Sequence, residues 1–189
     1  VIDHTTTSAN LSMEMNTALL AKDCYFIDAP VSGGQSGAEG GNLSIMAGGD
    51  VKAYDDSKDI FNSYSRFHKL MGSSGSGQLT KMVNQICIAG LIQALAEGMN
   101  FSERAGLNTS DVMEVITKGA AQSWQMENRW ETMLADQYDH GFAVDWMRKD
   151  LNIASEEANK IGADIEITNL VNRFYKDVQD LGGNRLDTS

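Results

Sequence analysis

The sequence predicts two structural regions, an α/β segment over residues 1–73 and an all-α segment over residues 74–189. Short apolar runs on either side of an amphipathic stretch give the first region the β-α-β spacing of a sheet protein. The small-residue run at 72–77, Gly-Ser-Ser-Gly-Ser-Gly, suits a domain hinge or a helix start. The long apolar stretch that follows has helical periodicity, so we expect a long interdomain helix.

The α/β region begins with the end of a strand at Ile2–His4, and Ser8 is a candidate N-cap for a helix that ends near Lys22. We expect this helix to pack through an apolar face made of Leu11, Met15, Ala18 and Leu19. The apolar block Tyr25–Ala29 stops at Pro30, which predicts a buried strand. The remaining predicted elements of this region are strands at 44–47 and 66–70 and a helix at 51–62.

The all-α region opens with a predicted helix over Gln78–Ala105, which carries apolar residues on nearly every face. This pattern is typical of a helix that is packed on several sides. Gly106 ends the helix, and Asn108–Ser110 offers the cap of the next one. The further predicted helices cover 111–118, 124–134, 145–161 and 168–181.

Composition limits the classes of partner and cofactor. A formal net charge of −11 argues against nucleic-acid binding, because phosphate contacts need clustered Lys and Arg. No apolar run approaches the roughly 20 residues of a membrane span, so we expect no membrane partner. His4, His68 and His140 lack the spacing of metal ligands, and two cysteines suggest neither a disulfide scaffold nor a zinc site. We therefore predict no metal and a reducing, cytoplasmic location.

A glycine-rich segment follows the strand that ends at Pro30. Residues 28–34 read Asp-Ala-Pro-Val-Ser-Gly-Gly, and ligands of open α/β sheets bind at the carboxyl ends of strands. Gly33 and Gly34 allow backbone N–H groups to approach an anion, and Ser32 adds a hydroxyl donor, so the segment is suited to holding a carboxylate. From spacing alone, a simple glycine-rich turn is an equally good interpretation.

A lysine stands near the start of the long helix, in the string Gly-Ser-Gly-Gln-Leu-Thr-Lys at residues 75–81. Asn84 and Gln85 follow Lys81 at i+3 and i+4 and share its helix face. Because an unpaired buried ammonium is costly, Lys81 must reach a cleft, a partner or solvent. By itself the pattern favours a surface lysine that extends to solvent.

These two strings resemble signatures of the β-hydroxyacid dehydrogenase family, of the 3-hydroxyisobutyrate dehydrogenase type, which is related to tartronate semialdehyde reductase and 6-phosphogluconate dehydrogenase. The first string resembles the substrate-binding signature, which implies that Ser32, Gly33 and Gly34 bind the substrate carboxylate. The second resembles the catalytic Gly-x-Gly-x-x-x-Lys signature, which implies that Lys81 is the general acid and base. A lysine can take this role when desolvation and a nearby positive charge lower its pKa.

The amide beside the lysine departs from the family pattern. The family commonly carries Asn four residues after this lysine, whereas here Asn84 stands at +3 and Gln85 at +4. We favour Asn84 as the catalytic amide and keep Gln85 as a substrate-binding alternative.

Two further segments fit the same resemblance. Lys149-Asp150-Leu151 resembles a Lys-Asp-Leu signature whose Lys lies near the cofactor and whose Asp helps to position the catalytic lysine. The segment around Thr6 resembles the one whose hydroxyl contacts the nicotinamide ribose, with Thr5 as the next choice. The resemblance thus implies cofactor-binding roles for Thr6, Lys149 and Asp150. Without it, a Lys-Asp pair on a helix is usually a solvated surface pair.

The resemblance also implies a domain organisation. Residues 1–73 correspond to the C-terminal part of a Rossmann-type dinucleotide-binding domain, and residues 74–189 to an all-helical substrate and dimerisation domain. The Gly-x-Gly-x-x-Gly turn of a dinucleotide fold and the acidic or basic selector residue do not occur. We therefore expect a fragment that lacks roughly the first third of the family's chain and is inactive alone, with the choice between NAD and NADP left open.

The implied activity is NAD(P)-dependent hydride transfer to or from a small 3-hydroxy acid or its semialdehyde. We favour 3-hydroxyisobutyrate, with tartronate semialdehyde or another small semialdehyde second, and expect a homodimer or homotetramer formed through the helical domain. A sugar-phosphate substrate is disfavoured because that branch uses His beside the lysine. The alternative of another class is a non-catalytic binding or assembly module that keeps the fold, although such a module has no need of Lys81 or of Ser32–Gly34.

Overall fold

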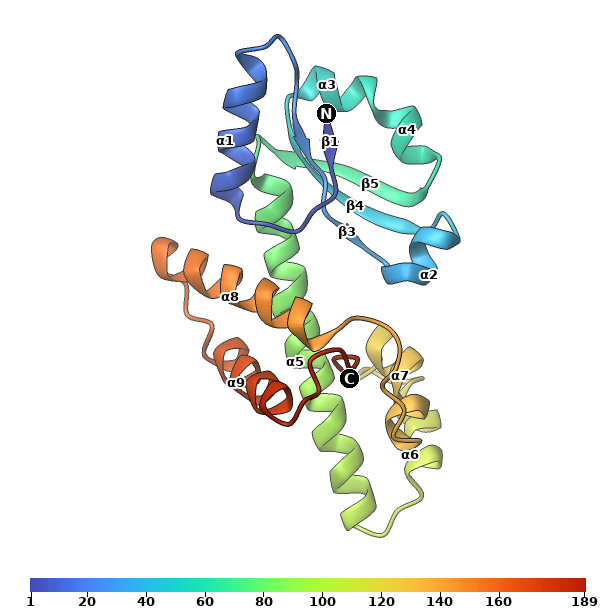
Figure 1. Cartoon of the computed structure of the whole chain (residues 1–189). Coiled ribbons are helices and arrows are strands. Elements are labelled where there is room, and N and C mark those ends of the chain that lie inside the picture. The colour runs from blue at the N-terminus through green and yellow to red at the C-terminus, as the bar shows by residue number, and fades with distance from the viewer. The chain divides into compact units, whose positions relative to one another are not determined.

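The computed structural model describes all of residues 1–189, which form two compact units (Figure 1). The first unit comprises Val1–Asn84 with Asn159–Ile161, and the second comprises Gln85–Ala158 with Gly162–Ser189. The division falls inside the long helix α5 (Ser76–Arg104), so the first turns of α5 belong to the first unit.

The first unit is built on a five-stranded mixed sheet. The central strand β4 (Leu43–Gly49) pairs in parallel with β5 (Ser65–Gly72) and antiparallel with both β2 (Ile27–Asp28) and β3 (Val31–Ser32). β1 (Ile2–Asp3) pairs in parallel with β2. The predicted strands are thus confirmed, although the second is two residues long, shorter than the predicted 25–29.

Apolar side chains of the central strand and of two short helices form the core of this sheet. Inward-facing residues alternate along β4, as expected for a strand with one covered face. The buried members of the core are Ile27, Ala29, Leu43, Ile45, Ala47, Ala53, Tyr54 and Phe61.

Helix α1 (Ala9–Leu20) begins as predicted, because the N-cap Ser8 accepts the N–H of Leu11 at 3.2 Å. The predicted packing face was wrong. Leu11 and Met15 are 44% and 41% exposed, whereas the buried residues of the helix are Ala9 and Ser12. The helix packs through small residues because its neighbour comes close: a Cβ on Gly75 would lie 3.2 Å from the Ala9 carbonyl oxygen.

Two predictions of local structure were too simple. The single helix predicted at 51–62 is two helices, α3 (Val51–Asp56) and α4 (Lys58–Asn62), which meet at Ser57. The segment predicted as a glycine-rich loop contains β3 and a short helix, α2 (Gly34–Glu39). Glycine has a low helix propensity, which explains why this helix could not be predicted.

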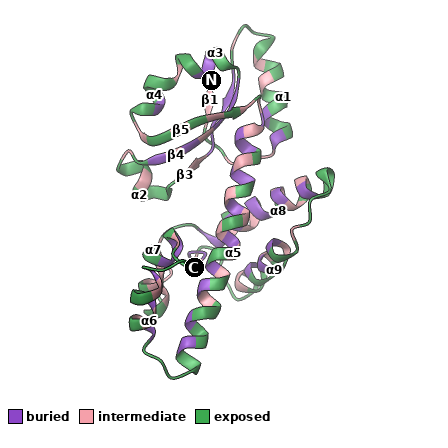
Figure 2. Cartoon of the chain, turned by 180° about the vertical axis from the view of Figure 1, so that it is seen from behind, coloured by how far each residue is buried: buried purple, intermediate pink, exposed green.

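The second unit is helical, as predicted. It contains most of α5 with α6 (Thr109–Ile116), α7 (Trp124–Leu134), α8 (Val144–Ile161) and α9 (Glu166–Asp180). One core joins α5 to α8 and α9 through residues such as Ala89, Leu151 and Val171. A second core joins a later stretch of α5 to α6 and α7 through Leu95, Met99, Met113 and Met126. Figure 2 shows buried and exposed positions alternating along α5, as expected for a helix with more than one packing partner.

Candidate active site

Lys81 lies in the second turn of α5 and is buried, with 8% of its surface exposed. Its Nζ donates a hydrogen bond to the carbonyl oxygen of Val31 at 2.9 Å. Val31 directly precedes Ser32 in β3, so the predicted acid–base lysine lies next to the start of the predicted carboxylate-binding turn. Since burial of an ammonium is costly without polar partners, this is a specific position and not that of a surface lysine reaching solvent.

The carboxylate of Asp28 holds the start of α5. Asp28 is fully buried, and its Oδ1 and Oδ2 accept the N–H groups of Gly75 at 2.7 Å and Gln78 at 3.1 Å. The first N–H groups of a helix have no partner within the helix, and this carboxylate supplies one. Burial raises the pKa of Asp28 above its ordinary value of 3.8, while the backbone N–H bonds act in the opposite direction. The end of β2 is thus bonded directly to the helix that carries Lys81.

The glycines of the Gly-x-Gly string allow the backbones to approach closely. A Cβ on Gly77 would lie 2.4 Å from the carbonyl oxygen of Met46 and 2.6 Å from that of Asp28. On the strand side, a Cβ on Gly48 would lie 2.7 Å from the backbone nitrogen of Gly77. The start of α5 therefore packs directly against the backbone of β2 and β4, and neither Gly48 nor Gly77 leaves room for a Cβ.

Gln78, three residues before Lys81, fixes the segment that contains Thr6. It is fully buried. Its Oε1 accepts the N–H of Thr7 at 3.0 Å, and its Nε2 donates to the carbonyl oxygen of Thr5 at 2.8 Å. Thr6, partly buried, lies between the two bonded residues. At the start of the segment, Nδ1 of His4 lies 2.6 Å from the carbonyl oxygen of Ala29.

Ser32, Gly33 and Gly34 form the turn from β3 into α2. Pairing of Ser32 with Ser44 fixes the end of the strand. Gly33 and Gly34 are exposed and have φ values of +138° and +61°, which side chains disfavour. A Cβ on Gly34 would meet nothing within 4 Å, so space is open beside this backbone. An exposed glycine turn with open space fits the close approach of a small anion.

The other predicted residues of the site lie in or next to the second unit. Gln85 and Asp150 are buried at 2% exposure each, and Gln85 Nε2 donates to Asp150 Oδ2 at 2.8 Å. The Nζ of Lys149 lies 3.0 Å from Asp150 Oδ1. Asn84, the last residue of the first unit's part of α5, is partly buried. The amide of Gln85 is therefore engaged with a carboxylate of its own unit.

Sequence reasoning overlooked Asp28 and Gln78 as individual residues. Asp28 lies in the segment 28–34 and Gln78 in the segment 75–81, where the prediction of function rested on the glycines, Ser32 and Lys81. A signal was available for each, because an acidic residue at the end of a buried strand and a glutamine on an apolar helix both require partners when buried.

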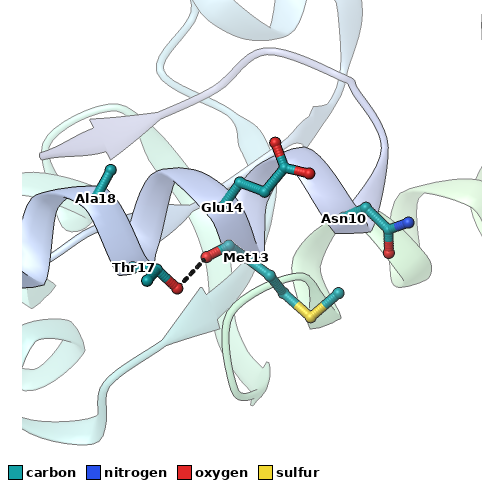
Figure 3. A pocket seen from close by; sticks show the side chains of 5 residues that line it. All are labelled: Asn10, Met13, Glu14, Thr17 and Ala18. Atoms are coloured by element: carbon teal, nitrogen blue, oxygen red, sulfur yellow. Dashed lines mark hydrogen bonds between the residues drawn. The ribbon is translucent and has the colours of Figure 1, made fainter.

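Other features of the structure are separate from these residues. A shallow hollow lies along α1 and is lined by Asn10, Met13, Glu14, Thr17 and Ala18 (Figure 3). No group of three or more His, Cys, Asp or Glu residues could hold a metal ion. The helix α5 is long and apolar enough to cross a membrane by length and composition, but the core helix of a soluble protein meets the same test.

Comparisons with known proteins agree with this architecture. A family model described as "NAD-binding of NADP-dependent 3-hydroxyisobutyrate dehydrogenase" matches residues 75–189. A second model, described as the NAD binding domain of 6-phosphogluconate dehydrogenase, matches residues 1–78. The fold and its matches thus define the class of the chain, that of the NAD-binding hydroxyacid dehydrogenases.

Individual relatives specify the family. The chain is 55% identical, over its whole length, to an uncharacterized oxidoreductase of Shewanella frigidimarina, and it spans 65% of that protein's length. It is 34% identical over 164 residues to the 2-hydroxy-3-oxopropionate reductase of Escherichia coli, covering 87% of this chain and 56% of the relative. The solved 3-hydroxyisobutyrate dehydrogenase of Salmonella typhimurium has a TM-score of 0.90 and 28% identity, with 100% of this chain and 67% of that chain covered. The chain belongs to the β-hydroxyacid dehydrogenase family, 3-hydroxyisobutyrate dehydrogenase type, which confirms the resemblance.

Proposed function

We propose that the full-length protein is an NAD(P)-dependent dehydrogenase of a small 3-hydroxy acid, with Lys81 as general acid and base. One observation carries the proposal: the buried Nζ of Lys81 is bonded to the residue before Ser32. An ammonium and an open glycine turn suited to a carboxylate thus come together, although 50 residues separate Lys81 from Val31.

The residues of the first unit fit a nicotinamide at the end of the parallel strands β1 and β2. The carboxyl ends of such strands are where open α/β sheets bind ligands. The Thr5–Thr7 segment follows β1 and is held in one conformation by Gln78, so the hydroxyl of Thr6 is a suitable contact for the ribose. When bound, the nicotinamide supplies the hydride acceptor for oxidation or the hydride donor for reduction.

The chain's own residues then have three tasks. Ser32, Gly33 and Gly34 bind the carboxylate through the hydroxyl and backbone N–H groups, which orients the substrate. The Nζ of Lys81, in its neutral form, takes the proton of the 3-hydroxyl group during oxidation and returns it during reduction. General acid–base help of this kind contributes typically about 10²- to 10⁴-fold to the rate.

We propose Asn84 as the amide that contacts the reacting part of the substrate. The bond from Gln85 to Asp150 supports this choice over Gln85, because an amide that serves a buried carboxylate has fewer donors left for a ligand. In the same scheme Lys149 contacts the cofactor, and Asp150 fixes Lys149 through their 3.0 Å ion pair.

Kinetics of Lys81 variants test the proposal. In the full-length protein, Lys81→Ala should lower kcat with 3-hydroxyisobutyrate by at least about 10²-fold, because proton transfer loses its base. Lys69→Ala, which removes an exposed lysine of β5, serves as the matched control and should leave kcat unchanged. Near-normal turnover of Lys81→Ala would remove the assigned role.

A substrate panel separates the alternatives. Absorbance of the reduced cofactor should rise when NAD or NADP is added with 3-hydroxyisobutyrate. It should fall when NADH or NADPH is added with tartronate semialdehyde or another small semialdehyde. Similarity to a 2-hydroxy-3-oxopropionate reductase supports including the second substrate. Lack of turnover with every pair would favour the non-catalytic assembly module.

Assembly and location complete the proposal. We propose a cytoplasmic homodimer or homotetramer formed through the helical unit. Exposed apolar residues of that unit, among them Phe101 and Val115 at 72% each, support association. Light scattering after size exclusion tests the oligomeric state.

A further inference from the structure

We propose that Gln78 is a positioning residue that holds the Thr5–Thr7 segment in register with Lys81. The inference rests on the proposed function, in which Thr6 contacts the nicotinamide ribose. It goes beyond that function by assigning a role to a residue that touches neither substrate nor cofactor.

The side-chain amide of Gln78 bonds to both sides of Thr6, with its oxygen and its nitrogen each contacting one neighbour. Its amide oxygen accepts the N–H of Thr7 at 3.0 Å, and its amide nitrogen donates to the carbonyl oxygen of Thr5 at 2.8 Å. The two bonds bracket Thr6. Because the side chain is 0% exposed, water does not replace these bonds easily when they are lost.

The identity of the residue follows from the two partners. One is a donor and the other an acceptor, so a neutral side chain with both functions at its end is required. A deprotonated Glu lacks the donor, and Met has the length but neither function. Asn has both functions but is one methylene shorter, so it cannot reach both partners from the same backbone position.

The backbone of Gln78 is fixed as firmly as its side chain. Its own N–H is bonded to the buried carboxylate of Asp28 at 3.1 Å. Lys81 follows three residues later, nearly one helical turn on, and is bonded to Val31. The first turns of α5 therefore position both the Thr5–Thr7 segment, through the side chain of Gln78, and the ammonium of Lys81.

Hydrogen exchange tests the link without any turnover. In Gln78→Met, the amide of Thr7 loses its acceptor, and its exchange rate should rise at least about tenfold. The matched control is Gln93→Met on the same helix, whose amide bonds only locally to Glu97 and which should leave Thr7 unchanged. Unchanged exchange of Thr7 in Gln78→Met would overturn the proposal.

Cofactor binding and kinetics in the full-length protein test the positioning role. For Gln78→Met, the Kd of NADPH measured by nicotinamide fluorescence should rise and kcat should fall, each about tenfold, with the KM of the hydroxy acid within about twofold of wild type. A residue that only supports the fold would instead lower the melting temperature and leave these constants of the folded protein unchanged, which would overturn the role.

A milder variant tests the proposal if Gln78→Met folds poorly. Gln78→Asn keeps the amide but shortens the side chain, so Thr7 exchange and the NADPH Kd should change in the same direction by a smaller factor. Wild-type values for both in a folded Gln78→Asn protein would refute the link. If the wild-type protein binds NADPH but oxidises no hydroxy acid, the proposed function fails while the exchange and binding data still decide the role of Gln78.

Discussion

Asp28 and Asp150 are buried carboxylates, one in each unit, and their partners differ in kind. Asp28 accepts short hydrogen bonds from the backbone N–H groups of Gly75 and Gln78, and its one side-chain donor, the hydroxyl of Ser74, is farther away at 3.4 Å. Asp150 accepts a hydrogen bond from the side chain of Gln85 and forms an ion pair with the side chain of Lys149. Backbone donors fix the path of the chain, whereas side-chain donors fix only other side chains and can rearrange when one member is lost. We therefore expect the Asp28 junction, which also includes Gly77, to be the less tolerant of substitution.

The largest effect is expected for Gly77→Ala. The new Cβ would lie within 2.4 to 2.8 Å of Met46 and Asp28 atoms, two of them backbone carbonyl oxygens, so β2, β4 or α5 must shift. We expect a loss of about 3 kcal/mol or more in the free energy of unfolding by urea denaturation. Gly98→Ala is the matched control on the same helix, because its Cβ would meet nothing within 4 Å. This control should stabilise the protein by about 0.5 to 1 kcal/mol, and equal effects of the two changes would contradict the close approach.

The second-largest loss in the free energy of unfolding is expected for Asp28→Asn. Asn presents an NH₂ group to one of two backbone N–H groups that need an acceptor, which leaves buried donors facing each other. The free energy of unfolding should fall by about 2 to 3 kcal/mol. Asp139→Asn, at an exposed position, is the control and should change it by less than about 0.5 kcal/mol.

Asp150→Asn should cost less, about 1 to 2 kcal/mol in the same measurement. The new amide oxygen still accepts from Gln85, and Lys149, whose side chain is 41% exposed, can turn to water. A cost above that of Asp28→Asn would reverse the comparison between the two units.

The smallest effect is the pH dependence that Asp28 contributes. Burial raises the pKa of Asp28 in the folded protein above its ordinary value of 3.8, so the folded state binds the proton more tightly than the unfolded state. The proton-linked part of the Asp28 contribution to stability is therefore fully present below pH 3.8 and is lost as the pH rises through the raised pKa, while the hydrogen bonds to Gly75 and Gln78 remain. The difference in unfolding free energy between wild type and Asp28→Asn should shrink as the pH rises from about 4 to 7. A difference that grows over this range would show a lowered pKa instead.

Much of the local structure could be predicted from sequence because its causes are local. Ser8, Asn108 and Ser123 cap the helices that follow them, and apolar periodicity marked α5 and α8. The exposed side of α1 and the break at Ser57 could not be predicted, because they depend on which neighbours each helix meets.

The sequence by itself determined most of the helices and strands in their order, the family, and the residue types available for chemistry, but not β3, α2 or the break between α3 and α4. Only the tertiary structure decided that Lys81 is buried against Val31, that Asp28 holds the start of α5, and that Gln78 brackets Thr6. The physical reason is sequence distance: these hydrogen bonds join residues 47 to 73 positions apart, and no helical or strand period connects them. They form because burial leaves each polar group no solvent partner, so the fold must supply one.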